Sequence, residues 1–447
     1  MKRTLLLCFL TLCAVFALDS KEPPSPKPPA PSSDDWPCFR GPGRMGIASP
    51  ANKDIPLEWS DTKNILWKRA LPGRGASSPV VWRDSIYLTA YSGYGIEKTD
   101  PYSNMPKLVR HLLCLDRRSG AVRWQVDLPI GKISEHGLSE FGFLHGFASS
   151  TPVVDADGVY VYFGAGGVFA YDHAGHQRWH LLAGKKYEHN WGSASSPILF
   201  ENLLIVHPDV EQHALYALDK QNGCEVWHVE TGAGDSWSTP LIVEAAGRQE
   251  LVFHHSAADH KDKSGTALIA AVNPRNGEPL WECRMLKDYL CPSPVAKDGF
   301  IYWLGYQKAA AVRAGGQGDV TATHVEWTAT RGTSVCTPVL HDGHLYWANE
   351  ENGLAYCLNA KTGAVVYSER LQPPPGRLYA SGVLAGDRIY YVSREKGTWV
   401  VEAKPSFRQL AHNRIESDTG IFNGTPAICG NRLFLRSDRF LYCIGTK

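Results

Sequence analysis

The sequence has almost no excess of charge of either sign. It contains 46 Lys and Arg against 45 Asp and Glu, which gives a formal net charge of +1 at pH 7. Proteins that bind nucleic acid or anionic membranes usually carry an excess of positive charge in a patch or tail. We therefore expect no nucleic acid and no anionic lipid surface among the partners of this chain.

Long hydrophobic runs are missing beyond the first residues. Lys2 and Arg3 precede a short apolar stretch at 5–16, and Val15 and Ala17 stand at the two positions that a signal peptidase reads. We predict a signal peptide over 1–17, cleaved after Ala17, in preference to a lipid anchor at Cys13. No other apolar run approaches the roughly 20 residues that span a bilayer. The sequence thus predicts an exported protein, periplasmic or extracellular, with no transmembrane span.

Common catalytic motifs are also absent. The chain has no HExxH, no paired CxxC and no GxSxG segment, so the usual signatures of zinc proteases, zinc or redox sites and serine hydrolases are missing. His254 and His255 lie near Asp259, His260 and Asp262, but their spacing fixes no metal geometry. We interpret this stretch as a solvated loop. The sequence predicts no catalytic residue and no metal site.

The cysteines do not form a disulfide framework. Of the eleven, two fall in the predicted signal peptide, and the remaining nine cannot all pair. Cys114, Cys357 and Cys443 share one place in the repeat described below, so we interpret most of the nine as buried thiols that pack as small hydrophobic residues.

Residues 18–35 are rich in proline and poor in apolar side chains. A segment of this composition cannot bury a core and favours an extended, polyproline-like chain. We predict a disordered linker over 18–35, followed by a single domain over 36–447.

The chain does contain a recurrent pattern, first seen at 112–124. Alternating apolar residues lead to Asp116, which can cap a turn, then to Gly120, which supplies a left-handed conformation, and then to Trp124. This order predicts a tight β-hairpin. The pattern returns from Asp172 to Trp179, Asp219 to Trp227, Asn273 to Trp281 and Asn359 to Tyr367.

A second pattern precedes the first in each repeat and consists of Ser or Thr followed by Pro. It occurs at Ser78-Pro79, Thr151-Pro152, Ser196-Pro197, Thr239-Pro240, Ser293-Pro294, Thr337-Pro338 and Thr425-Pro426, with Ser381-Gly382 in the remaining place. If Gly382 is counted as the missing proline, the intervals between successive proline positions are 73, 45, 43, 54, 44, 44 and 44 residues. The two longest intervals contain insertions at 91–110 and 256–265.

Eight units with two hairpins each predict an all-β, eight-bladed β-propeller of four-stranded antiparallel blades. The last repeat ends before its outer strand, while residues 65–71 form an outer strand without inner ones, so we predict a ring closed by this N-terminal strand. Large tryptophans at the blade edges suit a structural role. We interpret the following residues as a latch between blades: Asp116, Gly120, Trp124, Asp172, Trp179, Asp219, Trp227 and Trp281.

The two patterns resemble the PQQ-like, or quinoprotein-dehydrogenase-like, β-propeller repeat, and the resemblance covers residues 36–447. Residues 35–42 and 59–68 are similar to the N-terminus of exported bacterial members. The superfamily includes quinoprotein dehydrogenases, which resemble one another in an adjacent cysteine pair and in carboxylate and amide ligands for Ca²⁺ beside the quinone. It also includes the BamB-like, non-catalytic propellers. No two cysteines are adjacent in this chain.

The resemblance therefore implies a non-catalytic binding or scaffold module of the cell envelope, without a cofactor. The alternative is a PQQ-dependent oxidoreductase that uses calcium, or a divergent enzyme of the same superfamily. The fold alone does not decide between these two hypotheses, because one fold can carry different functions.

Residues just before each inner strand should gather on one rim of that channel. They are Arg74, His145, Phe147, Trp191, Asp235, Trp237, Tyr289, Tyr379 and Asn423. Aromatic side chains with a few polar groups around a concavity are typical of ligand and peptide sites, and the alternative is that they only plug the ring. We predict that this rim binds a protein or a small ligand, that the chain acts as a monomer, and that the segments 91–110 and 131–146 add further walls.

Overall fold

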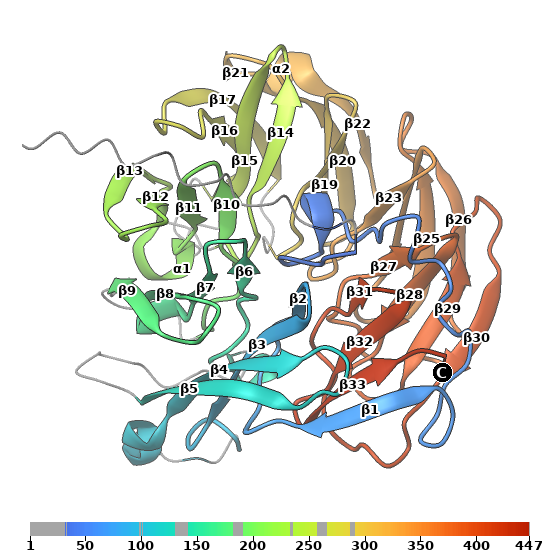
Figure 1. Ribbon diagram of the computed structural model, residues 1–447. Helices are drawn as coiled ribbons and strands as arrows, with labels where there is room; N and C mark the ends of the chain where they lie inside the picture. Colours follow the sequence, from blue (N-terminus) through green and yellow to red (C-terminus); the bar gives the residue numbers. More distant parts are fainter. Residues whose placement is uncertain are drawn as a thin grey trace, which may run out of the picture.

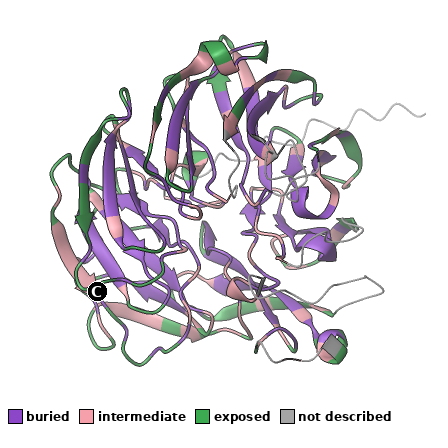
Figure 2. Ribbon diagram, turned by 180° about the vertical axis from the view of Figure 1, so that it is seen from behind, coloured by how far each residue is buried: buried purple, intermediate pink, exposed green. Residues whose placement is uncertain are grey.

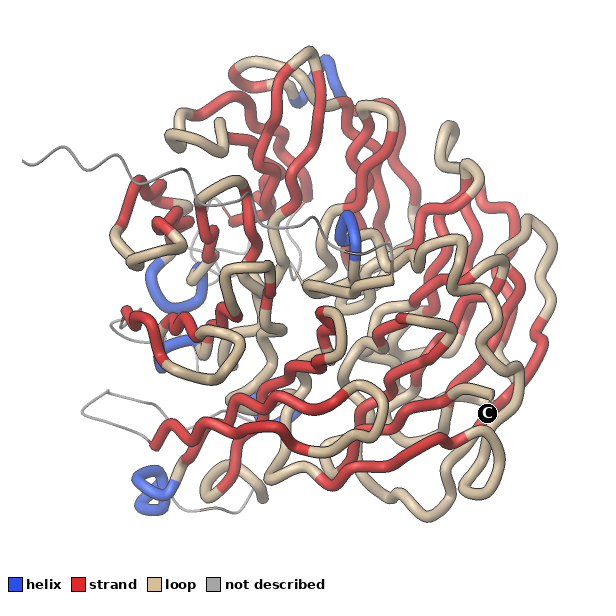
Figure 3. Tube along the Cα trace, in the orientation of Figure 1, coloured by secondary structure: helices blue, strands red, loops and turns tan. Residues whose placement is uncertain are grey.

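The eight predicted repeats form a ring of eight antiparallel sheets (Figure 1). The structure is a computed structural model that describes residues 32, 34–97, 100, 102–129, 142–181, 191–232, 236–256, 266–286 and 291–446. Strands dominate it, as Figure 3 shows, and the helices of the described residues are three to six residues long. The prediction of an all-β, eight-bladed propeller is confirmed.

Each blade has four strands that follow one another outward from the ring axis. The innermost strands are β2 (Val80–Trp82), β6 (Val153–Val154), β10 (Ile198–Phe200), β14 (Leu241–Ala245), β18 (Val295–Lys297), β23 (Val339–His341), β27 (Val383–Ala385) and β31 (Ala427–Cys429). The second strands are β3 (Ser85–Ser92), β7 (Val159–Tyr162), β11 (Leu203–Val206), β15 (Arg248–Ser256), β19 (Phe300–Gly305), β24 (His344–Ala348), β28 (Arg388–Val392) and β32 (Arg432–Arg436).

The third strands are β4 (Val109–Asp116), β8 (Val168–Tyr171), β12 (Ala214–Asp219), β16 (Thr266–Val272), β20 (Lys308–Arg313), β25 (Leu354–Asn359), β29 (Thr398–Glu402) and β33 (Phe440–Ile444). The outer strands are β5 (Val122–Pro129), β9 (Gln177–Leu181), β13 (Glu225–Glu230), β17 (Pro279–Leu286), β22 (Val325–Ala329), β26 (Val365–Arg370), β30 (Gln409–Asn413) and β1 (Ile65–Ala70). We number the blades one to eight from β2, so that β31, β32, β33 and β1 form blade eight.

The ring is closed by the strand predicted for this role. β1 pairs antiparallel with β33, and Trp67 lies opposite Cys443. One departure from the repeat occurs in blade five, where residues between β20 and β22 form β21 (Gly318–Asp319) and α2 (Thr321–His324). β21 pairs in parallel with β17 and adds a fifth strand to blade four.

The recurrent tryptophan of one blade contacts the turn of the next. The indole Nε1 of Trp179 donates a hydrogen bond to the Lys220 carbonyl (3.0 Å), and its ring packs on Gly223. A Cβ at Gly223 would lie 2.6 Å from that ring, and its φ is +77°, so both packing and backbone favour glycine there. Trp67, Trp124, Trp227 and Trp327 make the same pair of contacts one blade further on. Trp281 differs, because its Nε1 donates to Glu250 within blade four.

The acidic residue of the pattern holds the turn itself. Asp116 Oδ1 accepts the backbone N–H of Arg118 (3.1 Å) and of Ser119 (2.8 Å). Asp116 Oδ2 also accepts a hydrogen bond from Arg123 (2.6 Å). These contacts hold the pKa of Asp116 below its usual value, with the Arg123 hydrogen bond as the largest cause.

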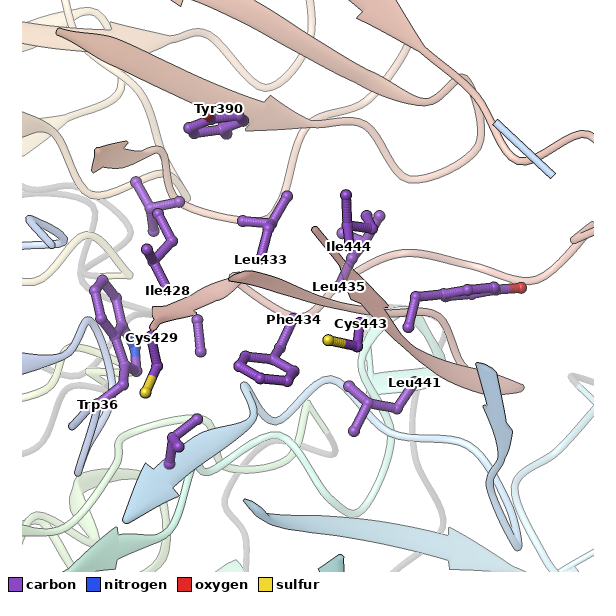
Figure 4. Packing of buried hydrophobic residues seen from close by; sticks show 14 of the residues in the cluster. Trp36, Tyr390, Ile428, Cys429, Leu433, Phe434, Leu435, Leu441, Cys443 and Ile444 are labelled. Carbon is purple, nitrogen blue, oxygen red and sulfur yellow. The ribbon is translucent and has the colours of Figure 1, made fainter. Parts of the chain in front are cut away.

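The hydrophobic core runs around the ring between neighbouring blades, and Figure 2 shows buried inner strands and exposed outer ones. Its largest cluster joins blades seven, eight and one to the N-terminal segment. Figure 4 shows Trp36 beside Ile428 and Cys429, with Phe434 and Tyr390 in the same cluster. The first described residues are therefore part of the ring.

The short helices lie in the connections. They are η1 (Pro42–Arg44), η2 (Tyr102–Lys107), η3 (Gly142–Leu144), η4 (Gly164–Gly166) and α1 (Asp209–Gln212). In the described part of the chain, no helix is long and apolar enough to cross a membrane. The predicted signal peptide and nearly all of the predicted linker lie outside the described residues.

The interpretation of His254 and His255 as part of a solvated loop is wrong. Both residues belong to β15, and His254 is fully buried. Burial lowers the pKa of His254 to about 3, so its ring is neutral at physiological pH. Asp259, His260 and Asp262 lie outside the described residues, and the described residues contain no group of three metal-ligating side chains.

Candidate functional site

A cavity of about 530 Å³ lies in the middle of the ring and takes residues from all eight blades. Two positions of every repeat line it. One is the residue directly before the proline position, and the other is the residue two places earlier. This volume is in the range of sites that hold drug-sized ligands, about 300–1,000 Å³.

The position directly before the proline always carries a hydroxyl group. We call these eight buried residues the hydroxyl belt: Ser78, Thr151, Ser196, Thr239, Ser293, Thr337, Ser381 and Thr425. Seven hydrogen bonds link them in order around the ring, each from the backbone N–H of one member to the side-chain oxygen of the next, at 2.9–3.0 Å. The belt therefore joins the inner ends of all eight blades.

The belt is open at one place, between blade eight and blade one. The Ser78 hydroxyl is buried and has no hydrogen-bond partner among the described residues. Beside it, the fully buried Arg436 donates from Nη1 to the Ser77 carbonyl (2.8 Å) and the Ser77 hydroxyl (2.6 Å). Burial lowers the pKa of Arg436 to about 9. Arg436 thus bonds blade eight to blade one where the eighth link of the belt is missing.

A segment at residues 36–48, the N-terminal plug, closes one end of the channel. Trp36 exchanges backbone hydrogen bonds with Val81 of β2, and Ile47 forms a bridge to Leu384 of β27. Arg44 reaches the Leu199 carbonyl of β10 (3.2 Å). The plug thus contacts blades on several sides of the ring, and Figure 3 shows its helix η1 inside the ring of strands.

Arg40 anchors the plug. Its fully buried guanidinium donates to the carbonyls of Thr337 (3.1 Å), Pro338 (2.5 Å) and Met45 (2.7 Å), all of them uncharged acceptors. Burial lowers the pKa of Arg40 to about 9. Phe39 lines the cavity from this side. Because the inner strands run from the rim toward the plug, the cavity has a floor and opens at the rim.

Two tryptophans form one wall at the opening. The rings of Trp191 and Trp237 stack with centroids 5.5 Å apart and planes at 24°. Trp237 Nε1 donates to the Gly192 carbonyl (2.8 Å), which fixes its orientation. His145 uses both ring nitrogens, with Nδ1 at 2.5 Å from the Ser149 hydroxyl and Nε2 at 2.6 Å from the Trp191 carbonyl. Burial lowers the pKa of His145 to about 4, so the ring is neutral.

The facing wall comes from blades seven and eight. Tyr379 lies beneath the guanidinium of Arg394, whose carbon is 4.6 Å from the ring centroid. Arg394 Nη1 also donates to Asn423 Oδ1 (2.9 Å) and to the Leu144 carbonyl (3.1 Å), and Asn423 Nδ2 donates to that same carbonyl (2.6 Å). Leu144 belongs to η3, which precedes blade two. The η3 segment therefore crosses part of the opening and is held on the far side.

Among the described residues of the lining, the charged side chains are two carboxylates and one guanidinium, Glu350, Glu351 and Arg377. Both oxygens of the buried Glu350 accept hydrogen bonds, from the Thr333 hydroxyl (2.6 Å) and the Ser334 N–H (2.9 Å). Glu351 and Arg377 are exposed at the opening. The described part of the lining therefore carries one more negative group than positive.

The structure brings five of the predicted rim residues into this lining: His145, Trp191, Trp237, Tyr379 and Asn423. Arg74 lies elsewhere, in ion pairs with Asp438 (3.5 Å) and Glu97 (3.3 Å), and Phe147 packs against Tyr91. Asp235 and Tyr289 lie outside the described residues. Of the segment 91–110, no described residue lines the cavity, and of 131–146 only Leu144 and His145 do so among those described.

The sequence reading missed the hydroxyl belt, the plug and the three charged residues of the lining. The signal for the belt was visible, because every repeat has Ser or Thr before the proline position. Nothing comparable marks the plug, since residues 36–48 belong to no repeat.

The described residues do not fit pyrroloquinoline quinone with calcium. That cofactor is a polycarboxylate, whereas the lining offers one guanidinium against two carboxylates and a neutral imidazole. A calcium ion takes six to eight oxygen ligands. Both oxygens of Glu350 are already bonded within the protein, and the described residues contain no metal-ligating group of three.

The chain was compared with known protein families. A family model described as "Outer membrane protein assembly factor BamB" matches residues 110–369 and 267–439. No curated protein sequence matches the chain significantly.

Solved structures share the fold at low sequence identity. BamB from Moraxella catarrhalis is 14% identical, with a TM-score of 0.57, over 86% of this chain and 97% of that chain. The quinohemoprotein alcohol dehydrogenase from Comamonas testosteroni is 13% identical, with a TM-score of 0.62, over 93% and 81%. The enzyme ADHIIG from Pseudomonas putida HK5 is 10% identical, with a TM-score of 0.60, over the same shares. These similarities establish the fold, which BamB and the quinohemoprotein alcohol dehydrogenases share.

Proposed function

Because the chain belongs to the family described as outer membrane protein assembly factor BamB, a PQQ-like propeller family, we propose that it is an exported, non-catalytic binding module of the cell envelope. The partner, a protein or a small ligand, enters the cavity at the opening formed by Trp191, Trp237 and Tyr379. The signal peptide predicted for 1–17 and the proline-rich linker would place the propeller outside the cytoplasm on a flexible tether.

The observation that carries this proposal is the shape of the cavity. The N-terminal plug gives it a floor, and its opening is lined by aromatic side chains. Trp237 and His145 are held by hydrogen bonds to backbone or neighbouring hydroxyls, so this wall is preorganised. A preorganised aromatic wall loses little conformational entropy when a ligand binds.

The polar groups of His145 and Glu350 in the lining favour binding over chemistry. His145 has a lowered pKa and both its nitrogens are engaged, so it is poorly suited to accept or donate a proton at neutral pH. Glu350 is likewise held by two protein donors. The lining thus supplies contact area and orientation.

The test is capture of the natural partner by the cavity. The full chain, immobilised through its C-terminus, is exposed to envelope extract, and bound proteins and small molecules are identified by mass spectrometry. We expect the Trp191→Ala, Trp237→Ala double variant to lose the partner, while Val226→Ala, at an exposed site on outer strand β13, retains it. Equal capture by all three chains would contradict binding in the cavity.

The alternative hypothesis is a PQQ-dependent oxidoreductase, since quinohemoprotein alcohol dehydrogenases share the fold. It is tested by adding PQQ and Ca²⁺ to the full chain and following the quinone absorbance and the reduction of a dye by alcohols. We expect neither stoichiometric quinone binding nor turnover. Both together would replace the binding module by an enzyme.

A further inference from the structure

The cavity has two walls of different chemistry on opposite sides of the ring. Trp191 and Trp237 precede the inner strands of blades three and four. Arg377 and Tyr379 precede the inner strand of blade seven, which faces blade three in a ring of eight. The first wall is aromatic, and the hydrogen-bonding groups of His145 and Trp237 are already used there.

A polar wall runs from blade seven through Glu351 of blade six to Tyr306 of blade five. No hydrogen bond joins the Glu351 carboxylate or the Tyr306 hydroxyl to another described residue, and Tyr306 is 45% exposed. Arg377 makes one long hydrogen bond, from Nη1 to the Tyr379 hydroxyl (3.4 Å). One carboxylate, one guanidinium and two phenols from blades five, six and seven therefore line the cavity beside and opposite the aromatic wall.

We propose that the cavity binds a short, uncharged oligosaccharide, and this assignment rests on the proposed binding function. A sugar ring has an apolar C–H face, which packs on the aromatic wall, and a periphery of hydroxyl groups, which face the polar wall. Two neighbouring sugar hydroxyls donate hydrogen bonds to the two oxygens of the Glu351 carboxylate. Two neighbouring hydroxyl oxygens accept hydrogen bonds from the paired N–H groups of the Arg377 guanidinium. The Tyr306 and Tyr379 hydroxyls serve either role.

Other ligand classes fit the two walls less well. A strongly anionic ligand would meet Glu350 and Glu351, and a strongly cationic one would meet Arg377. A flat heterocycle gains most from aromatic rings on both of its faces, whereas the stacked pair lies on one side here. A peptide carries its backbone donors and acceptors along a single line, while a sugar carries them around the whole ring.

The depth of the site sets the length of the ligand. The N-terminal plug closes the channel at Phe39, so the ligand cannot thread through the ring. One end of a saccharide chain therefore enters the cavity, and the remaining units extend past the η3 segment into solvent.

The experiment is calorimetric titration of the full chain with cellotetraose, maltotetraose and chitotetraose. Oligogalacturonate, adenosine and tetra-alanine serve as anionic, heterocyclic and peptide comparators. We expect saturable binding of at least one neutral tetrasaccharide at one site per chain. Trp191→Ala should weaken it at least about tenfold, as for a central aromatic contact, and Glu351→Gln should weaken it severalfold because one neutral amide replaces a carboxylate acceptor.

Val226→Ala is the matched control and should bind like the parent chain, and thermal unfolding curves of all variants verify the fold. The saccharide assignment is wrong if no neutral tetrasaccharide binds at millimolar concentration, if only a comparator binds, or if Trp191→Ala and Glu351→Gln bind the sugar as the parent does. If the sugars fail but the double tryptophan variant still loses its envelope partner, only the ligand class is wrong. If both experiments fail, the binding function of the cavity is wrong as well.

Discussion

The hydroxyl belt allows the same substitution to be compared at an engaged and an unengaged site. Ser196→Ala removes the oxygen that accepts the Thr151 N–H (3.0 Å) and leaves that buried N–H without a partner. Ser78→Ala removes a hydroxyl that has no partner, from an equally buried position in the same belt. The two substitutions delete the same atom at equivalent places in the repeat.

The substitutions should change the free energy of unfolding by different amounts, and Ser78→Ala should not change it in the same direction as the others. An unpaired buried N–H costs about 1–3 kcal/mol, so Ser196→Ala should lower the free energy of unfolding by this amount. Ser293→Ala should do the same, because its oxygen accepts the Thr239 N–H (3.0 Å). Ser78→Ala should leave the free energy of unfolding unchanged or raise it slightly, because it removes an unsatisfied buried group.

Urea unfolding followed by tryptophan fluorescence measures these differences as shifts in the midpoint at constant slope. If Ser78→Ala lowers the midpoint as much as Ser196→Ala, the belt bonds do not contribute to stability, and the loss reflects packing alone. If none of the three variants changes the midpoint, the belt is a by-product of the fold. Either result would refute the reasoning.

Further predictions concern the plug, the closure, the latch and the effect of pH, each followed by urea unfolding. Arg40→Met should cost about 3 kcal/mol, because several buried carbonyls lose a charged donor. Deletion of 36–72 should abolish the cooperative transition, and a truncated chain that unfolds like the full one would contradict the closure. Trp179→Phe should cost about 1 kcal/mol through loss of its hydrogen bond to Lys220. Burial raises the pKa of Glu211 from 4.5 to about 7. The native state therefore keeps a proton that the unfolded chain releases, and the free energy of unfolding should fall by about 3 kcal/mol as pH rises from about 4.5 to 7. Glu211→Gln should flatten this decline, and an unchanged pH profile would exclude Glu211 as its source.

The fold could be predicted because its determinants are local and repeated. Each hairpin is specified by a few neighbouring residues, such as Asp116 and Gly120, and the interval of about 44 residues then implies the ring. The ring closure could be predicted because residues 65–71 form an outer strand without inner strands, while the last repeat has inner strands without an outer one. The pairing of β1 with β33 confirms it.

The site could be predicted only in part, because its geometry depends on relations between blades. The position before each proline was visible, but its hydroxyl matters through an N–H that lies more than 40 residues away. Arg74 shows the opposite error. It has the right place in the repeat for a rim residue, yet Asp438 and Glu97 draw its side chain away from the cavity. Glu351 lies in the turn between β24 and β25, outside the segment before an inner strand where rim residues were expected.

The N-terminal plug has a consequence for the order in which the chain assembles. Arg40 of the plug reaches forward by hundreds of residues, to the carbonyls of Thr337 and Pro338 at blade six. These partners are synthesised late, whereas Trp36 and Arg44 contact Val81 and Leu199 of blades one and three, so the plug docks in stages as the blades form. β1 finds its partner strand only when β33 is made, so blade eight is completed at the end of synthesis. A chain interrupted before its final repeat would have no closed ring.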